Sequence, residues 1–405
     1  MARTSMLLSI LAAATLSVAA CNTKGPSGLS GDTDETGEGG TGGEVSTPAP
    51  IDRSGVTFDP DTAGALGQRK LDYNEALRTA SLKLVRALPT LAQVKHVQNA
   101  ADPKAAYEEE LDLMFADVRF QERMIKWWQD TMRLGGGAAN GKPSRNTAPV
   151  FAARVVAEEQ PFSELFTAPN NTCPTYDNTA HQFKDGECDN NAPVVSGILT
   201  NPGAMFQFYG SMAFRRVRWI QETFVCTKFP AEYSATPVHM GGADYTSPWE
   251  FETVATAPID FQDTSSVICA NCHTTLNHIA PLFGNFDDKG QYQGSIQVMT
   301  PTTPDPVKTQ MSHWLRGGET MHWRKGQEVK DLAELGQAIA ADPDVAECAV
   351  ARAYNFAFSK EDIVTDLATV PPSVLSKYVE EFQKNGQNLK KTMRAIFASG
   401  DFVRY

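Results

Sequence analysis

The stretch VICANCHTTLNHIAPLFGNFD, residues 267–287, contains two cysteines separated by two residues and a histidine directly after the second. Cys269, Cys272 and His273 therefore have the spacing of a c-type haem attachment site. Two thioether bonds to the vinyl groups of haem require cysteines about one helical turn apart, and the adjacent histidine then reaches the iron from its proximal side. The sequence predicts one covalent haem c, held by Cys269 and Cys272, with His273 as the proximal iron ligand.

Three other kinds of site use a similar pair of cysteines. A redox dithiol normally lies in a βαβ context, and no such pattern surrounds residues 267–287. Zinc could be held by both cysteines together with His273 and His278, but no second pair of ligands is evident in the sequence. A structural disulfide between Cys269 and Cys272 is the remaining alternative, in a host that lacks the machinery for haem attachment.

The N-terminus predicts export. Arg3 precedes an uncharged apolar run over residues 6–20, which is too short to span a bilayer and is typical of a signal peptide over residues 1–20. The sequence VAAC at 18–21 resembles a bacterial lipobox, so Cys21 is the expected lipidation site, carrying palmitate-type acyl chains. An ordinary cleavage site is the alternative. The residue after Cys21 is Asn22 and not an aspartate, which by resemblance to bacterial lipoproteins favours anchoring in the outer membrane. The protein would face either the periplasm or the cell surface.

The composition limits the partners of the chain. Residues 22–50 contain eight glycines and no aromatic side chain, so residues 21–65 are predicted to be a flexible tether. The formal net charge is −12 and no basic patch is visible, which argues against nucleic-acid binding. No second apolar run is long enough to cross a membrane. The chain is therefore expected to bind a membrane through its lipid anchor alone. Export also supports the haem prediction, because c-type haem attachment takes place outside the cytoplasm.

The rest of the chain predicts a mainly α fold. Asp102-Pro103 is a helix start, and an apolar face follows it. That face consists of Tyr107, Leu111, Met114, Phe115 and Val118. Further helices are expected over 120–131, after Asp342-Pro343, and over 371–384 and 387–398. A short strand is expected near 296–299 and a loop over 299–309. The glycine-rich stretch 135–144 is either a domain boundary or an ordered loop inside one body.

Four cysteines remain for disulfides in an oxidising compartment. Cys173 and Cys188 bracket a polar loop, so a local bridge between them is the first pairing. Cys226 would then pair with Cys348 across the fold. Four cysteines allow three connectivities, and the sequence alone does not choose among them.

The run CANCHTTLNHIAPLFGNFDDKG at 269–290 resembles the planctomycete-type cytochrome-c-like family, a group of exported proteins of largely unknown function. Looser matches follow the family order at 82–94, 113–134, 196–232, 331–362 and 389–405. The resemblance implies a helical N-terminal module over 66–200, packed with a cytochrome-c-like helical haem module over 201–405. Cys226 and Cys348 lie where the family often has a cysteine, which supports their pairing. The chain departs from the family at Asn277-His278, where Asp-Pro is usual, and at Ala280-Pro281, which replaces a glycine.

The second axial position of the iron decides what a haem would do. Met299 is the favoured distal ligand, and other candidates follow the motif. These are Met311, Met321, His313 and His322, and His278, His239 and Met240 also lie nearby in sequence. Arg215, Arg216 or Arg218 could contact haem propionates, although a solvated helix face is the favoured interpretation of RRVRW.

The predicted function is a monohaem c-type cytochrome that transfers single electrons to and from an unidentified redox partner protein. The alternatives are a non-catalytic surface lipoprotein whose Cys269 and Cys272 form a disulfide, and a haem peroxidase-like enzyme with an open sixth position.

Overall fold

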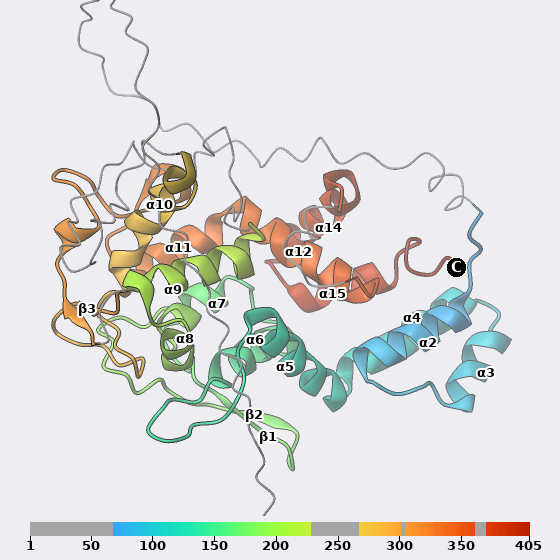
Figure 1. The fold of residues 1–405 in the computed structure, drawn as a ribbon. Coiled ribbons are helices and arrows are strands. Elements are labelled where there is room, and N and C mark those ends of the chain that lie inside the picture. Colours follow the sequence, from blue (N-terminus) through green and yellow to red (C-terminus); the bar gives the residue numbers. More distant parts are fainter. Residues whose placement is uncertain (1–67, 228–266, 301–304, 361–369) are drawn as a thin grey trace, which may run out of the picture.

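The computed structural model describes residues 68–227, 267–300, 305–360 and 370–405, with the side chains of helix α10 described from Cys272 onward. The described chain is mainly helical, with three short two-stranded sheets (Figure 1). The mainly α fold predicted from the sequence is confirmed. The cytochrome-c-like character of residues 201–405 stays a prediction. The signal peptide, the tether and Cys21 fall within residues 1–67, outside the described part.

Five helices form the N-terminal half of the body. They are α2 (Tyr73–Leu84), α3 (Leu91–Asn99), α4 (Pro103–Ala116), α5 (Val118–Met132) and α6 (Thr147–Ala157). The first four each begin after a residue whose side-chain oxygen accepts a hydrogen bond from the backbone of the first turn, which satisfies amides that a helix start leaves unpaired. Val118 opens α5 with 40% of its surface exposed, so the apolar face predicted for α4 ends earlier, at Phe115.

The glycine-rich stretch 135–144 connects two helices that pack against each other. α5 and α6 lie side by side, and Asn146 accepts hydrogen bonds from Gln129 and from the backbone of Gly136 across the base of the connection. Gly136 adopts a φ of 106°, which the left-handed region allows most easily for glycine. This stretch is therefore an ordered loop between α5 and α6.

The middle of the chain contains short elements tied together by disulfides. They are α7 (Glu164–Thr167), β1 (Thr175–Asp177), β2 (Gln182–Lys184), η1 (Gly197–Thr200), α8 (Pro202–Gln207), η2 (Ser211–Ala213), α9 (Phe214–Ile220) and the π-helical η3 (Gln221–Val225). Cys173 and Cys188 bridge the base of the β1–β2 hairpin. Cys226 follows η3 directly and bridges to Cys348. Both predicted disulfides are confirmed.

The C-terminal half begins with the helix that contains the C-x-x-C-H motif and ends in a group of helices. Its elements are α10 (Val267–Ile279), η4 (Ala280–Phe283), β3 (Gln297–Val298), β4 (Val307–Lys308), η5 (Met311–His313), β5 (His322–Trp323), η6 (Arg324–Gly326), β6 (Gln327–Glu328), α11 (Leu332–Ala341), α12 (Pro343–Ala357), α14 (Pro372–Lys384) and α15 (Leu389–Phe397). β3 confirms the predicted short strand. Its partner β4 lies within the predicted loop 299–309, because Val298 and Val307 pair across an antiparallel ladder.

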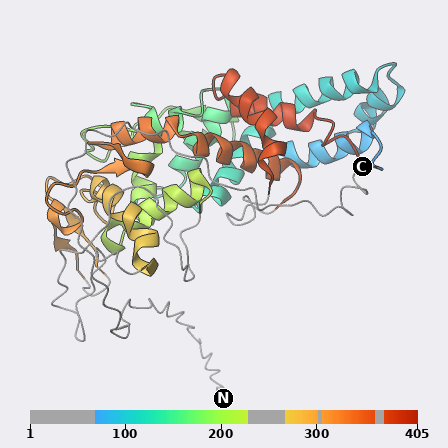
Figure 2. The same cartoon turned by 90° about the horizontal axis from the view of Figure 1, so that it is seen from above.

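The buried apolar side chains form one continuous cluster from Ala76 to Val403. The two ends of the described chain meet within this body, since the Lys70 and Tyr405 backbones exchange two hydrogen bonds of 2.9 Å. Helices α2 to α4 lie at one end of the elongated body, and α10 lies at the opposite end (Figures 1 and 2). The C-x-x-C-H motif in α10 is therefore far from helices α2 to α4 in space.

Candidate functional site

His273 lies in the middle of α10, and its ring is oriented by the same helix. Its Nδ1 lies 3.1 Å from Oδ1 of Asn277, one turn further along. A carboxamide oxygen only accepts hydrogen bonds, so Nδ1 carries the proton and donates it, while Nε2 keeps its lone pair. Burial lowers the pKa of His273 to about 4, against a small opposing effect of the hydrogen bond to Asn277. The imidazole is therefore neutral at pH 7, as an iron ligand must be.

Phe214 of α9 packs edge-on against this imidazole. The ring centroids are 5.0 Å apart and the ring planes are inclined at 84°. Phe214 follows three consecutive residues in the left-handed region, with φ of 46° at Ser211, 59° at Met212 and 63° at Ala213. Such a backbone costs roughly 1 kcal/mol per non-glycine residue, so tertiary contacts must hold it. The strained turn positions the ring that fixes His273.

The contacts that hold this turn also bring Met299 to the same end of the molecule. The backbone N–H of Met212 donates to the carbonyl oxygen of Met299 over 2.8 Å, and the indole N–H of Trp314 donates to the carbonyl oxygen of Met212 over 3.1 Å. Met299 is half-buried and belongs to the segment that continues from β3. The fold thus places Met299 beside the turn that leads to Phe214, while its role as distal ligand stays a prediction.

The other predicted site residues are placed as follows. Cys272 is half-buried in α10, directly before His273. Cys269 belongs to the same helix, but its side chain lies outside the described part of the structure, as does all of Cys21. A role for these three cysteines in haem attachment and lipidation stays a prediction.

Arg216 is buried and makes hydrogen bonds to backbone carbonyl groups. Its guanidinium donates to the carbonyl oxygens of Met205 at 2.7 Å, Phe283 at 2.6 Å and Phe286 at 3.1 Å. Burial lowers its pKa to about 9. For this residue the solvated helix face expected from RRVRW is wrong, because the carbonyl ends of α8 and η4 converge on it. Arg215 and Arg218, on the same helix, are exposed.

A pair of imidazoles lies on the side of α10 that faces β5. The rings of His278 and His322 stack with centroids 3.8 Å apart and planes inclined at 29°. Nδ1 of His278 lies 2.9 Å from the Thr320 carbonyl oxygen, and Nδ1 of His322 lies 3.1 Å from that of Trp323. Burial lowers the pKa of both groups, that of His322 to about 4. The pair is neutral at pH 7 and joins α10 to the loop before β5.

This histidine pair does not have the arrangement of a metal site. Two nearly parallel rings do not direct their ring-nitrogen lone pairs toward one point. Among the described residues, no group of three or more His, Cys, Asp or Glu side chains could hold a metal ion. The sequence offered His278 as a zinc or iron ligand and His322 as an iron ligand. It did not predict their contact, which joins residues too distant in sequence for a local pattern to reveal.

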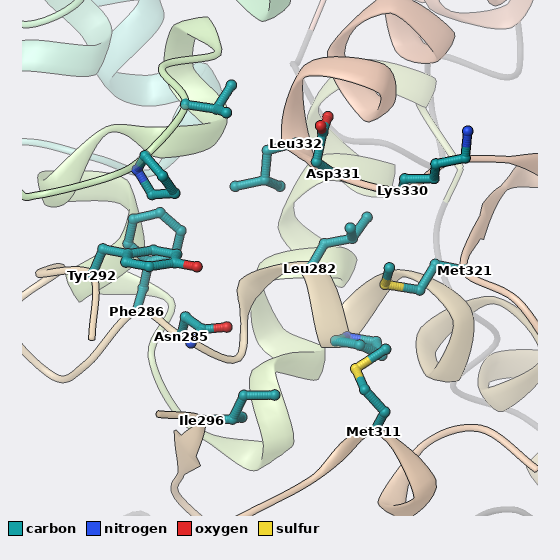
Figure 3. A pocket seen from close by; sticks show the side chains of 13 residues that line it. Leu282, Asn285, Phe286, Tyr292, Ile296, Met311, Met321, Lys330, Asp331 and Leu332 are labelled. Atoms are coloured by element: carbon teal, nitrogen blue, oxygen red, sulfur yellow. The ribbon is translucent and has the colours of Figure 1, made fainter. Parts of the chain in front are cut away.

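A pocket of about 200 Å³ opens beside η4 (Figure 3). It lies close to the C-x-x-C-H motif in sequence. Met311 and Met321 lie on one side of it, and Phe286 and Tyr292 lie on the other. Neither Cys272 nor His273 lines this pocket. Two of the alternative distal ligands, Met311 and Met321, therefore face this separate hollow.

No known protein-family model matches the chain, and neither the curated proteins nor the solved structures contain a match. Within the described ranges, none of the helices is both long and apolar enough to cross a membrane. Because no comparison suggests a function, the geometry of α10 and its neighbours has to indicate one.

Proposed function

We propose that this protein is a monohaem c-type cytochrome, with haem c attached through Cys269 and Cys272 and with His273 as the proximal ligand. The observation that carries the proposal is the 3.1 Å contact between Nδ1 of His273 and Oδ1 of Asn277, which assigns the ring proton to Nδ1. The Nδ1–H of His273 is held by Asn277 while its Nε2 keeps a lone pair. Ligating histidines almost always donate their other ring N–H to such an acceptor. The C-x-x-C-H spacing, its position in a helix and this tautomer all support a role of His273 as the proximal ligand.

The chain's own residues would serve the cofactor in defined ways. Haem iron, when bound, supplies reversible uptake and release of one electron. Asn277 and Phe214 would hold the proximal imidazole in one orientation. Met299, favoured as distal ligand, would raise the reduction potential and suit electron transfer. The exchange partner would be another one-electron carrier protein, because the proposed activity changes only the charge of the iron.

The proposal includes a place in the cell. A diacylated Cys21 would anchor the protein to the outer membrane, and residues 21–65 would hold the folded body away from the lipid surface. The sequence resemblance to the planctomycete-type cytochrome-c-like family supports both export and haem attachment. A variant Cys21→Ser should lose incorporation of labelled palmitate and should leave the membrane fraction. Palmitate labelling that persists in this variant would contradict the anchor.

The test of the cofactor is an intact-mass and pyridine-haemochrome measurement on protein expressed together with haem-attachment machinery. Wild type should carry one covalent haem, and a Cys269→Ala, Cys272→Ala variant should carry none. The matched control, Cys173→Ala with Cys188→Ala, also removes two cysteines but should keep the haem. A wild type without haem, in which Cys269 and Cys272 are oxidised to each other, would instead support the non-catalytic surface lipoprotein.

The spectrum separates the cytochrome from the peroxidase-like alternative. A low-spin spectrum in wild type that becomes high-spin in Met299→Ala is expected if Met299 is the distal ligand. The control Met311→Ala should remain low-spin, because Met311 lines the separate pocket beside η4. A high-spin wild type that responds to peroxide would reject Met299 and favour the enzyme.

A further inference from the structure

We infer that Asn277 is a positioning residue that sets the electron-donating strength of His273, and that its uncharged amide keeps the reduction potential of the haem higher than an acid at the same position would. This inference rests on the proposed function and goes beyond it. It concerns how one side chain of this protein controls the iron, which neither the haem motif nor the helical fold specifies.

The contact between the two residues lies within one helix. Asn277 is fully buried and lies one helical turn after His273 on the continuous helix α10. Its Oδ1 accepts the Nδ1 proton over 3.1 Å. Since both side chains project from the same rigid helix, the distance between them does not depend on the closure of a loop. Bulk water has little access to a fully buried acceptor, so Asn277 has no simple substitute for this role.

A second contact limits how the ring can turn. Phe214 packs edge-on against the imidazole at 5.0 Å and comes from α9, a different element. A hydrogen bond in the plane of the ring and an aromatic contact beside it together select one ring orientation. The acceptor at position 277 therefore changes the chemistry of Nε2 without first having to reorient the ring.

The identity of the acceptor determines how much electron density reaches Nε2. A carboxylate accepts a hydrogen bond roughly twice as strongly as a neutral group and makes a ligating histidine more basic. A more basic imidazole stabilises the more positive, oxidised iron, which lowers the reduction potential. An amide has a weaker effect in the same direction, and an apolar side chain has none. The expected order of potentials is apolar highest, amide intermediate and carboxylate lowest.

The experiment compares the midpoint potentials of four haem-loaded proteins by optical redox titration with mediators. They are wild type, Asn277→Asp, Asn277→Leu and the control Asn355→Asp. Asn355 is a fully buried asparagine of α12, which lies away from α10 (Figures 1 and 2). Its replacement therefore adds a buried carboxylate on a helix distant from His273. We expect a lower potential in Asn277→Asp, a higher one in Asn277→Leu and the wild-type value in the control. Equal potentials in all four proteins would overturn the inference.

A second measurement remains decisive if a buried carboxylate prevents folding. In wild type labelled with ¹⁵N-histidine, the Nδ1 resonance of His273 should show a bonded proton, and it should move when Asn277→Leu removes the acceptor. A resonance that stays unchanged would reject the role of Asn277. The failures are distinguishable, because a wild type without covalent haem contradicts the proposed function, whereas a haem protein insensitive to position 277 contradicts only this inference.

Discussion

Replacing His322 by phenylalanine should make the protein less sensitive to acid. The imidazole of His322 stacks on His278 and is almost fully buried. Burial is the largest cause of its lowered pKa, and the neighbouring His278 adds to it. The hydrogen bond to the Trp323 backbone opposes the shift, as do Glu319 and Glu328. Phenylalanine keeps a planar ring against His278 but cannot take up a proton. The substitution therefore removes the titration and retains most of the packing.

The size of the effect follows from the two protonation equilibria of this side chain. The pKa of His322 falls from an ordinary 6.5 to about 4 on folding. Between these values the unfolded chain binds a proton that the folded protein excludes, so the free energy of unfolding decreases as the pH falls from 6.5 toward 4. At pH 7 this contribution to stability is fully present. At pH 4 about 3 kcal/mol of it has been lost, at 1.36 kcal/mol for each pH unit between the two values.

The assay is urea denaturation of the full chain with intact disulfides, at pH 7 and at pH 4, followed by circular dichroism. The decrease in the free energy of unfolding between the two pH values should be about 3 kcal/mol smaller in His322→Phe than in wild type. The control Tyr354→Phe also leaves a phenylalanine in place of a partly buried ring, which stacks on Phe358. Burial raises the pKa of Tyr354 to about 12, so this side chain does not titrate between pH 4 and pH 7 and its replacement should keep the wild-type pH dependence. The same decrease in His322→Phe as in wild type would refute the reasoning.

Two further predictions concern the scaffold around the site. Replacing Cys226 and Cys348 by serine should reduce the free energy of unfolding by about 5 kcal/mol, and replacing Cys173 and Cys188 should reduce it by about 3 kcal/mol. The first disulfide closes the longer loop, with a sequence separation of 122 against 15. A larger loss for the shorter loop in urea denaturation would contradict this order. Ala213→Gly should leave the free energy of unfolding unchanged or raise it by up to about 1 kcal/mol, since glycine adopts the left-handed backbone without strain. A loss above about 1 kcal/mol in the same assay would show that the turn is not strained.

Several features of this protein were determined by short stretches of sequence. The helix starts at Asp102 and Asp342 follow from side chains that cap the nearest amides, and both occur in the structure as predicted. The bridge between Cys173 and Cys188 closes a short loop, so its partners are close in the chain as well as in space. Even the contact of His273 with Asn277 is a relation between positions one helical turn apart. It was not predicted, although an acceptor four residues after a ligating histidine was a signal that could have revealed it.

Tertiary structure alone decided the contacts between elements that are distant in sequence. RRVRW has the composition of an exposed helix face, yet Arg216 is buried because the carbonyl ends of α8 and η4 meet around it. Phe214 reaches His273 only through a left-handed turn that distant backbone groups hold in place. His278 and His322 stack because β5 packs on α10. Local patterns report the interactions that a segment makes with itself, whereas these contacts depend on where the packing of the whole core brings separate segments together.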